Sequence, residues 1–381
     1  MSLRILFCTL GYDTLAAGGA ERQARLQAEE LVRRGHRVTV IAPLLEGARS
    51  ETINGVEVRR LPMIDRRIIR NATYLPFLAM YLMLRMRRFD VVHVHVANLQ
   101  VDVAAIAARL HRRPLYVKVA TGGPLGEVQR FRRVARLTRY VGLRTAARVQ
   151  AISDEIASDL LSIGVPRARL LRIPNGIDLT DCNDRGHGAD PGDRARLGLP
   201  ADAVVTLFVG RFAAYKGLDD LLAAWTRLRG SRSRRLVLVG QRNGAPDHAM
   251  AQSDDVLIRP WTADIGSYFR VADIFVLPSH SEGMSNALLE AMACGLPAVA
   301  TRVGAAETMI EHGRNGVLVE PRDPDGLAHA LDRLIEDPET RRSMGPAAAA
   351  AIRDRFDIRS VVDRIEEAYF EIAGSGRRRP R

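Results

Sequence analysis

Short apolar runs alternate with amphipathic stretches along this chain of 381 residues, and the alternation starts twice. In the first half the apolar runs have the length of buried strands: 3–9, 38–41, 91–96, 115–119 and 149–152. The residues between them have helical spacing, as in 20–34, which stops at Gly35 as helices commonly do. Strands that alternate with helices predict βαβ units and a parallel sheet.

A polar, glycine-rich stretch at 181–192 interrupts this pattern, which then begins again. The second set of apolar runs is 204–209, 236–239, 256–258, 274–277 and 298–301. We therefore predict two doubly wound α/β domains, 1–178 and 179–355, with a final helix at about 356–373 that packs back on the first domain and a basic tail at 374–381. Such sheets bind ligands at the carboxyl ends of their strands, so two facing domains would share one cleft.

The composition is that of a soluble globular protein, with 47% hydrophobic and 26% charged residues. The longest apolar run, 74–84, is interrupted by Pro76 and is shorter than the roughly 20 residues that a spanning helix needs. The apolar run 5–10 resembles a buried strand more than a leader peptide. Three cysteines form neither a disulfide framework nor a metal-binding spacing: Cys8, Cys182 and Cys294. These features predict a cytoplasmic protein.

The net charge of +12 comes almost entirely from arginine, because Lys118 and Lys216 are the only lysines. Such an excess can serve nucleic acid, an anionic membrane or an anionic substrate. Aromatic residues are only 5% and do not interleave with the arginines, which argues against nucleic acid. The run 74–84 is followed by Arg85, Arg87 and Arg88, and more arginines fall in 130–148, so peripheral contact with an anionic membrane is predicted. A buried core helix with a solvated basic end is the alternative.

The most informative segment is 279–297, which leaves a predicted strand, turns at Gly283 and opens a helix near Ser285. The backbone amides of Met284, Ser285 and Asn286, with the positive end of the helix dipole, would suit a phosphate group. Glu282 precedes the turn and Glu290 lies in the helix, and ionised carboxylates accept hydrogen bonds from sugar hydroxyls. An acidic residue that merely favours the helix dipole is the alternative.

A second loop of the same kind, 210–218, places two cations after another predicted strand. It contains Arg211 and Lys216, and Lys216 is one of two lysines in a chain that otherwise uses arginine. This favours a role for Lys216 in stabilising the charge of a phosphate over that of an ordinary solvated surface residue. The two loops together predict a ligand that carries phosphate and sugar.

These residues resemble the retaining glycosyltransferases of family 4, which have the GT-B fold of two Rossmann-like domains. The resemblance covers nearly the whole chain and follows these elements in order: Gly18-Gly19-Ala20-Glu21, the strand 90–95, Asn175-Gly176-Ile177-Asp178, Gly210-Arg211, Lys216-Gly217, the segment 282–290, Gly304-Ala305-Ala306-Glu307 and Asn315-Gly316-Val317-Leu318-Val319. The segment with paired glutamates is the most specific of them.

The resemblance implies a hexosyltransferase of carbohydrate biosynthesis that moves a sugar, with retention, from a nucleotide diphosphate sugar to an acceptor hydroxyl. A UDP-sugar is favoured, a GDP-sugar is next, and the acceptor would be a glycan, a glycolipid or a small glycoside. No cofactor besides this co-substrate is implied. By this resemblance, Arg211 and Lys216 would bind the diphosphate, and Glu290 would bind the ribose. Glu282 and the backbone amides of 284–286 would bind the transferred sugar. At Gly18 and Gly19, which lack a Cβ, the backbone could approach the phosphates closely.

One departure concerns the loop after the fourth predicted strand, where many relatives carry a histidine that contacts the donor sugar. Here the loop reads Lys118-Val119-Ala120-Thr121-Gly122-Gly123-Pro124, and Lys118 and Thr121 are candidates for the missing contact. An ordinary strand end with a Gly-Pro turn is the alternative. His93 and His95 alternate with valines and so share one face of their strand, where they either reach the cleft or are satisfied inside the fold.

Metal independence is also expected. The Asp323-Pro324-Asp325 motif precedes a late helix, where aspartate caps helices, and the cysteines and histidines offer no ligand cluster. Two rival functions remain. One is a sugar-nucleotide epimerase of the same fold, and the other is a basic protein that binds membrane or nucleic acid.

Overall fold

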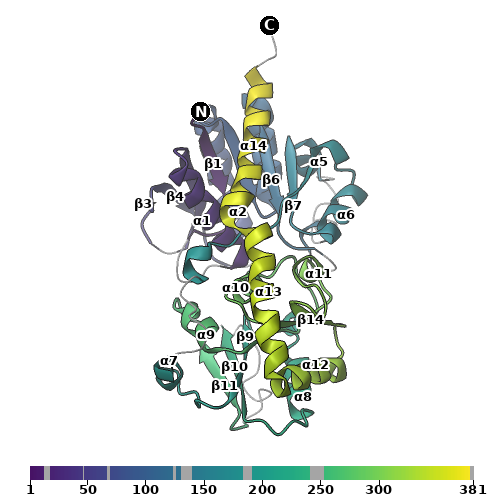
Figure 1. The fold of residues 1–381 in the computed structure, drawn as a ribbon. Helices are drawn as coiled ribbons and strands as arrows, with labels where there is room; N and C mark the ends of the chain where they lie inside the picture. Colours follow the sequence, from purple (N-terminus) through teal and green to yellow (C-terminus); the bar gives the residue numbers. More distant parts are fainter. Residues whose placement is uncertain are drawn as a thin grey trace. The chain divides into compact units, whose positions relative to one another are not determined.

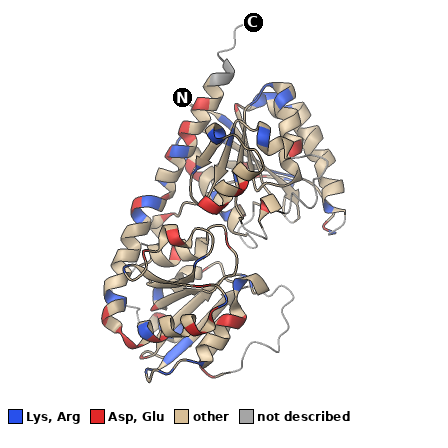
Figure 2. Cartoon of the chain, turned by 90° about the vertical axis from the view of Figure 1, so that its right-hand side faces the viewer, with Lys and Arg blue, Asp and Glu red and all other residues tan. Residues whose placement is uncertain are grey.

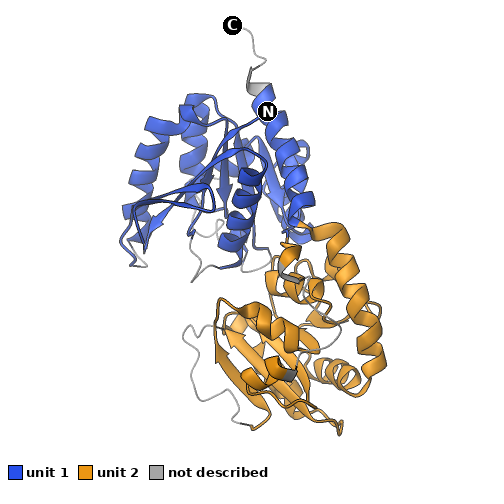
Figure 3. Cartoon of the chain, turned by 60° about the vertical axis from the view of Figure 1, so that its left-hand side comes forward, with its two compact units in different colours: residues 1–176, 358–381 blue, residues 177–357 orange. Residues whose placement is uncertain are grey.

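The computed structural model describes residues 1–12, 18–45, 47–66, 69–122, 126–129, 140–182, 191–240 and 253–377. The chain forms two compact units (Figure 3). Unit 1 consists of residues 1–176 and 358–381, and unit 2 consists of residues 177–357. The chain therefore passes from unit 1 to unit 2 and returns at its C-terminal end.

Unit 1 contains an eight-stranded sheet in the order β3-β4-β2-β1-β5-β6-β7-β8. All neighbouring strands are parallel except β3, which pairs antiparallel with β4. The strands are β1 Arg4–Cys8, β2 Arg37–Leu44, β3 Ser50–Ile53, β4 Val56–Pro62, β5 Val91–His95, β6 Leu115–Val119, β7 Arg148–Ala151 and β8 Leu170–Arg172. The sequence analysis did not predict the edge strands β3 and β8, or β4, which lies between β3 and β2.

Helices cover both faces of this sheet (Figure 1). They are α1 Gly19–Arg33, α2 Arg70–Arg85, η1 Met86–Arg88, α3 Leu99–His111, α5 Val141–Thr145, α6 Asp154–Ser162, η2 Arg167–Arg169 and α14 Ile358–Arg377. Ile5 and Phe7 of β1 belong to the core that α1 and α14 share. Because side chains alternate along a strand, Leu6 and Cys8 point to the opposite face. Both pairs are buried, as expected for a parallel strand covered on two sides.

Unit 2 contains six parallel strands in the order β11-β10-β9-β12-β13-β14. They are β9 Val204–Val209, β10 Arg234–Gly240, β11 Val256–Pro260, β12 Ile274–Leu277, β13 Ala298–Thr301 and β14 Gly316–Val319. Its helices are η3 Leu179–Cys182, α7 Pro191–Arg196, η4 Ala214–Lys216, α8 Leu218–Thr226, α9 Ile265–Val271, α10 Asn286–Ala293, α11 Ala306–Met309, α12 Pro324–Glu336 and α13 Pro338–Phe356. The prediction of two doubly wound α/β domains is confirmed.

The strand order of unit 2 locates a switch point. The chain runs outward from β9 through β10 to β11, and then crosses to β12 on the other side of β9 before it continues to β13 and β14. In open α/β sheets, ligands bind outside the carboxyl ends of the strands where the order reverses. The loops after β9 and β12 are therefore the expected binding loops of this unit.

No helix in the described part of the chain is long and apolar enough to cross a membrane. The apolar run 74–84 lies within α2, which is 16 residues long and contains Pro76.

Candidate functional site

The loops after β9 and β12 pack against each other at the switch point of unit 2. The backbone amide of His280 donates to the Tyr215 carbonyl at 2.8 Å. His280 Nε2 lies 2.7 Å from Asp220 Oδ2. The sequence motifs predicted both loops, and these contacts show that they form one structure.

Gly217 permits this close packing. Its φ of +66° lies in the left-handed region, and a Cβ at this position would be 2.0 Å from the Pro278 carbonyl oxygen. Only glycine combines that conformation with that clearance. The preceding residue, Lys216, is the last residue of the short helix η4, and the turn at Gly217 follows it directly.

Lys216 and Glu282 form an ion pair inside the site. Lys216 Nζ lies 2.5 Å from Glu282 Oε1, and their side chains are only 12% and 13% exposed. The Ser279 hydroxyl donates to the same Oε1 at 2.8 Å. The sequence analysis named Lys216 for the diphosphate and Glu282 for the sugar, and the structure makes these two residues direct partners.

Arg211 is exposed beside this pair. Its guanidinium carbon lies 5.9 Å from the centre of the Tyr215 ring, and Lys216 Nζ lies 5.7 Å from the same ring. Both are within reach of a cation–π interaction. Among the residues that the structure describes, no carboxylate forms an ion pair with Arg211, so its charge is available to an anionic ligand.

Helix α10 begins next to Glu282. Ser285 is its N-cap, and its hydroxyl accepts from the Leu288 amide at 3.3 Å. Met284 and Ser285 are buried and Asn286 is half-buried, at the positive end of the helix dipole. Glu290 is 8% exposed and lies in the second turn. This is the helix start that the sequence analysis predicted.

The strand β13 and the loop after it support the turn before α10 through residues that the site prediction omitted. Thr301 Oγ1 donates to the Ser279 carbonyl at 2.5 Å. The Ala305 amide donates to the Gly283 carbonyl at 2.8 Å, and a Cβ on Gly304 would lie 2.5 Å from that oxygen. The Gly304-Ala305 dipeptide was noted as a family element, and its glycine was the available signal.

The remaining candidates lie in unit 1. Gly18 is the N-cap of α1 and Gly19 its first residue, while 13–17 lie outside the described residues. Thr121 is half-buried after β6. Gly123 and Pro124 of the same predicted loop, and 130–139 of the arginine-rich stretch, are also not described.

His93 and His95 lie inside unit 1 on the face that α14 covers. Their rings stack with centroids 3.9 Å apart, and His93 Nδ1 lies 2.5 Å from the Tyr369 hydroxyl. Burial, together with the nearby charge of Lys118, holds the pKa of both histidines well below its usual range. Both rings are therefore neutral at physiological pH.

Lys118 lies on β6 next to His95 of β5 and is 1% exposed. Burial lowers the pKa of Lys118 to about 7, and the carboxylate of Glu127 counteracts part of this effect. Glu127, which was not predicted, is also buried, and burial raises its pKa to about 7. Its carboxylate accepts from the Ala97 amide at 2.6 Å and from the Ala120 amide at 3.1 Å. Glu127 thus ties together the segments that follow β5 and β6.

The Asp323-Pro324-Asp325 motif has the capping role expected from its sequence. Asp323 is the N-cap of α12 and accepts from the Gly326 amide at 2.9 Å, while Asp325 pairs with Arg227 at 2.7 Å. Within the described ranges, no three His, Cys, Asp or Glu side chains gather in a group that could hold a metal ion.

Comparisons with known proteins show similarity to glycosyltransferases over both units. Residues 17–181 match the family model described as Glycosyltransferase Family 4, and residues 203–337 match the model described as Glycosyl transferases group 1. A D-inositol 3-phosphate glycosyltransferase of Pseudarthrobacter chlorophenolicus is 34% identical over 69% of this chain and 66% of its own length. A D-inositol 3-phosphate glycosyltransferase 1 of Catenulispora acidiphila is 31% identical over 77% of this chain and 74% of its own. For another relative, from an Arthrobacter species, the matched part is only 44% of its length.

Solved structures share the fold. Anabaena HepE in complex with UDP and glucose superposes with a TM-score of 0.79 at 23% identity, over 97% of this chain and all of that one. Sucrose-phosphate synthase from Thermosynechococcus elongatus gives a TM-score of 0.79 at 22% identity, over 98% of this chain and all of that one. Both superpositions show the GT-B fold. This chain therefore belongs to glycosyltransferase family 4.

Proposed function

We propose that this protein is a retaining glycosyltransferase that binds a nucleotide diphosphate sugar in unit 2, at the loops after β9 and β12. The observation that carries the proposal is the Lys216–Glu282 pair at the switch point of the sheet, next to Arg211 and to the N-terminus of α10. Family membership supports the reaction class, and the site chemistry supports the donor class.

The diphosphate is the part of the donor that the two cations recognise. Without a ligand, Glu282 balances the charge of Lys216, while Arg211 has no carboxylate partner among the described residues. A diphosphate supplies anionic oxygens to both cations, and charge-assisted hydrogen bonds of this kind are among the strongest in proteins. The dipole of α10 adds to the same field.

The sugar and the ribose are recognised by carboxylates. Glu282, once Lys216 turns to the phosphate, accepts from hydroxyls of the transferred sugar, and Glu290 accepts from the ribose. Negative charge grows on the departing phosphate as the glycosidic bond breaks, so Arg211 and Lys216 act most strongly in the transition state. In this proposal the departing phosphate helps to deprotonate the acceptor on the same face, and neither a protein nucleophile, a metal nor a cofactor takes part.

We favour a UDP-sugar as donor, with a GDP-sugar next. HepE, which shares the fold, was solved with UDP and with UDP-glucose, and this supports the choice. The acceptor is a hydroxyl of a glycan, a glycolipid or a small glycoside. In unit 1 we keep Thr121, which is half-buried and hydrogen-bonded to Glu127, as a candidate for a ligand contact, whereas Lys118, His93 and His95 are buried.

Helix α2 supports the proposed peripheral contact with an anionic membrane at its cytoplasmic face. Tyr74, Leu78 and Leu82 are buried in unit 1. On the other side, Met80 is 54% and Leu84 is 72% exposed. Exposed arginines follow at Arg85, Arg87 and Arg88. An exposed apolar face with a basic end is typical of a helix that lies in the headgroup region.

The donor site is tested by a thermal-shift and calorimetry panel of UDP, GDP, ADP and TDP, because product nucleotides bind without an acceptor. One nucleotide should raise the Tm and bind well above the others. Turnover with the matching nucleotide sugar is then followed by NMR, and the anomeric configuration of the product decides between retention and inversion. Consumption of the donor without any acceptor would favour the epimerase, and binding of oligonucleotides but of no nucleotide would favour the nucleic-acid protein.

A further inference from the structure

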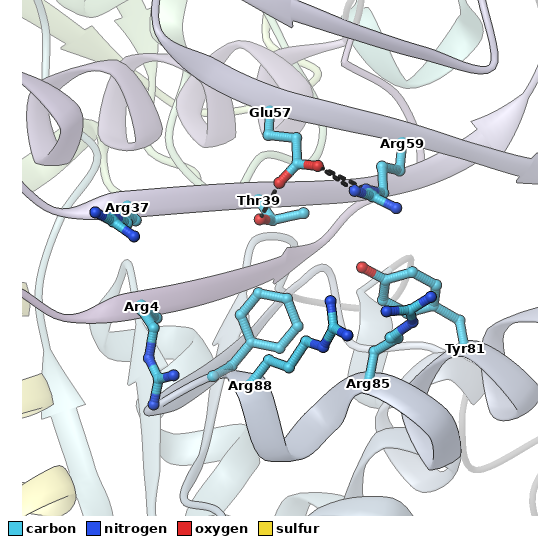
Figure 4. Close-up of a pocket in the computed structure, with 9 residues that line it drawn as sticks. Arg4, Arg37, Thr39, Glu57, Arg59, Tyr81, Arg85 and Arg88 are labelled. Carbon is cyan, nitrogen blue, oxygen red and sulfur yellow. Dashed lines mark hydrogen bonds and ion pairs between the residues drawn. The ribbon is translucent and has the colours of Figure 1, made fainter.

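Five arginines surround a small cavity in unit 1, at the amino ends of its strands. The cavity has a volume of about 180 Å³ (Figure 4). It is lined by Arg4 of β1, Arg37 and Thr39 of β2, Glu57 and Arg59 of β4, Tyr81 and Arg85 of α2, Arg88 of η1, and Phe89.

The strand register explains why these side chains meet. Arg4 is the Cα partner of Arg37, and Thr39 is the Cα partner of Glu57. Arg37 and Thr39 are two residues apart, so they share the sheet face that α2 covers. Arg4 and Arg37 are the first residues of their strands. The cavity thus opens at the amino end of the sheet, whereas Gly18 and Thr121 follow the carboxyl ends of β1 and β6.

Carboxylates neutralise only two of the five arginines. The Arg59 Nε donates to Glu57 at 2.7 Å, and Arg4 donates to Asp90 at 3.0 Å. The second oxygen of Glu57 accepts from the Thr39 hydroxyl at 3.0 Å. Arg37, Arg85 and Arg88 have no ion-pair partner among the residues that the structure describes. Three uncompensated cations therefore line one cavity.

All five arginines are exposed, so water screens their charges, and a bound anion would give the three unpaired ones a partner. The register places Arg4 and Arg37 at paired positions of neighbouring strands, and Asp90 neutralises the charge of Arg4 but not that of Arg37. In the view of Figure 2, basic and acidic residues both occur on helices and strands of the two units. Burial raises the pKa of Tyr81, so its hydroxyl stays protonated and can donate. The lining thus offers several donors and strong positive charge, and the one carboxylate in it is already paired.

The size of the cavity limits the anion. A volume of 180 Å³ corresponds to roughly six water molecules and is below the roughly 300 Å³ at which pockets for larger ligands begin. A phosphate group fits within this volume, which is too small to enclose a nucleotide sugar. Arginine is the side chain best suited to bind phosphate through two parallel hydrogen bonds.

We propose that this cavity, here called the arginine pocket, is a second anion site that binds a phosphate group through Arg37, Arg85 and Arg88. It is separate from the donor site of unit 2. The phosphate belongs either to a small free phosphorylated molecule or to the headgroup of an anionic lipid, since both present the same oxygens to the arginines.

The test is a calorimetric titration of the full-length protein with inorganic phosphate at low salt. It is done with and without saturating UDP, so that phosphate binding in unit 2 is separated from binding in the pocket. The parent should bind phosphate in the presence of UDP. The double variant Arg37→Ala, Arg88→Ala should lose at least about tenfold in affinity, since each charge-assisted hydrogen bond contributes at least that much. The matched control Arg49→Ala, Arg109→Ala removes two exposed arginines outside the pocket and should bind like the parent.

Further measurements check that the variants fold and identify the molecule that carries the phosphate. Circular dichroism checks each variant, and Arg37→Lys with Arg88→Lys, which keeps the charge, should retain partial binding. If vesicles of phosphatidic acid cosediment with the parent, and the pocket variant reduces this, the ligand is a lipid headgroup; phosphate binding without such cosedimentation indicates a free ligand. Lys216→Ala should weaken UDP binding but leave phosphate binding in the arginine pocket unchanged. Failure of the parent to bind phosphate, or equal binding by the pocket and control variants, would overturn the proposal and leave the donor site untouched.

Discussion

Lys216 Nζ lies 2.5 Å from Glu282 Oε1, although 66 residues separate them in the chain. The cation proposed for the diphosphate is thus neutralised, before any ligand binds, by the acid proposed for the sugar. A nucleotide sugar offers its diphosphate to Lys216 and its sugar hydroxyls to Glu282. A nucleotide diphosphate without the sugar offers a new partner to Lys216 alone. This difference separates donor binding from product binding.

Glu282→Gln tests that relationship directly. The carboxylate repels a diphosphate and holds Lys216, so its loss should keep UDP binding or tighten it by up to about tenfold. Turnover should fall by about 100-fold, because a neutral amide accepts sugar hydroxyls more weakly than a carboxylate. Isothermal titration with UDP and steady-state rates give the two numbers. A parallel loss of UDP affinity and turnover would contradict the assignment.

Arg211→Ala and Lys216→Ala should each weaken binding of the preferred nucleotide diphosphate by about 10- to 100-fold, since a charge-assisted hydrogen bond contributes roughly 1.5–3 kcal/mol. The kcat should fall further, because charge builds on the leaving phosphate in the transition state. Lys216→Arg should restore only part of the activity, because a planar guanidinium does not reproduce the contacts of a compact ammonium group.

Two arginines outside the site are matched controls for these variants. Arg229 is exposed in the same unit, and Arg377 lies at the end of α14. Alanine at either position should leave nucleotide affinity and kcat unchanged. If Arg211→Ala and Lys216→Ala behave like the controls, the donor site has been assigned to the wrong loops.

The fold and the binding loops of unit 2 could be predicted because their signals are local. The apolar runs 204–209 and 274–277 are the strands β9 and β12 as observed, and the helix start at Ser285 follows from a capping residue after a glycine turn. Family membership could be predicted for the same reason, because each family motif is a short continuous segment of the sequence. The family models confirm it.

Contacts between distant segments could not be predicted. No local signal shows that Lys216 pairs with Glu282, or that Glu127 binds amides of two segments that follow different strands. The alternation of His93 and His95 predicts a common face, yet only the packing of Tyr369 from the last helix shows which face it is. The edge strand β3 is short, polar and half-exposed, so it lacks the apolar run by which strands are recognised.

Turnover should survive EDTA. Arg211, Lys216 and the N-terminus of α10 together carry enough positive charge to balance a diphosphate without a divalent cation. The measurement compares initial rates before and after exhaustive EDTA treatment. A loss of rate that added magnesium restores would show that a metal shares this role.

Gly217→Ala should destabilise unit 2 and lower donor affinity. The new Cβ would lie 2.0 Å from the Pro278 carbonyl oxygen, so the two binding loops would have to separate. Gly313→Ala is the matched control, because its φ of +82° imposes similar strain but no atom lies within 4 Å of the Cβ. The control should cost about 1 kcal/mol, and Gly217→Ala clearly more. Calorimetric Tm values and UDP affinities of both variants check this, and equal losses would mean that the close packing is unimportant.

The buried Lys118 should make the stability of unit 1 depend on pH. Burial lowers its pKa from 10.5 to about 7, so between these values the unfolded chain binds a proton that the folded protein does not. Stability therefore rises with pH across this window, by at most about 1.4 kcal/mol per pH unit. Glu127, whose pKa burial raises to about 7, titrates in the opposite sense mainly between 4.5 and 7, below the window.

Lys118→Met removes this titration and keeps the length of the side chain. The free energy of unfolding of the parent, minus that of the variant, should therefore increase from pH 7 to about pH 10, because only the parent gains stability as its unfolded lysine loses its proton. Urea unfolding followed by circular dichroism at several pH values measures the difference. Circular dichroism is preferred to fluorescence because both tryptophans, Trp225 and Trp261, belong to unit 2. A difference that stays constant over this range would mean that Lys118 is charged inside the folded protein.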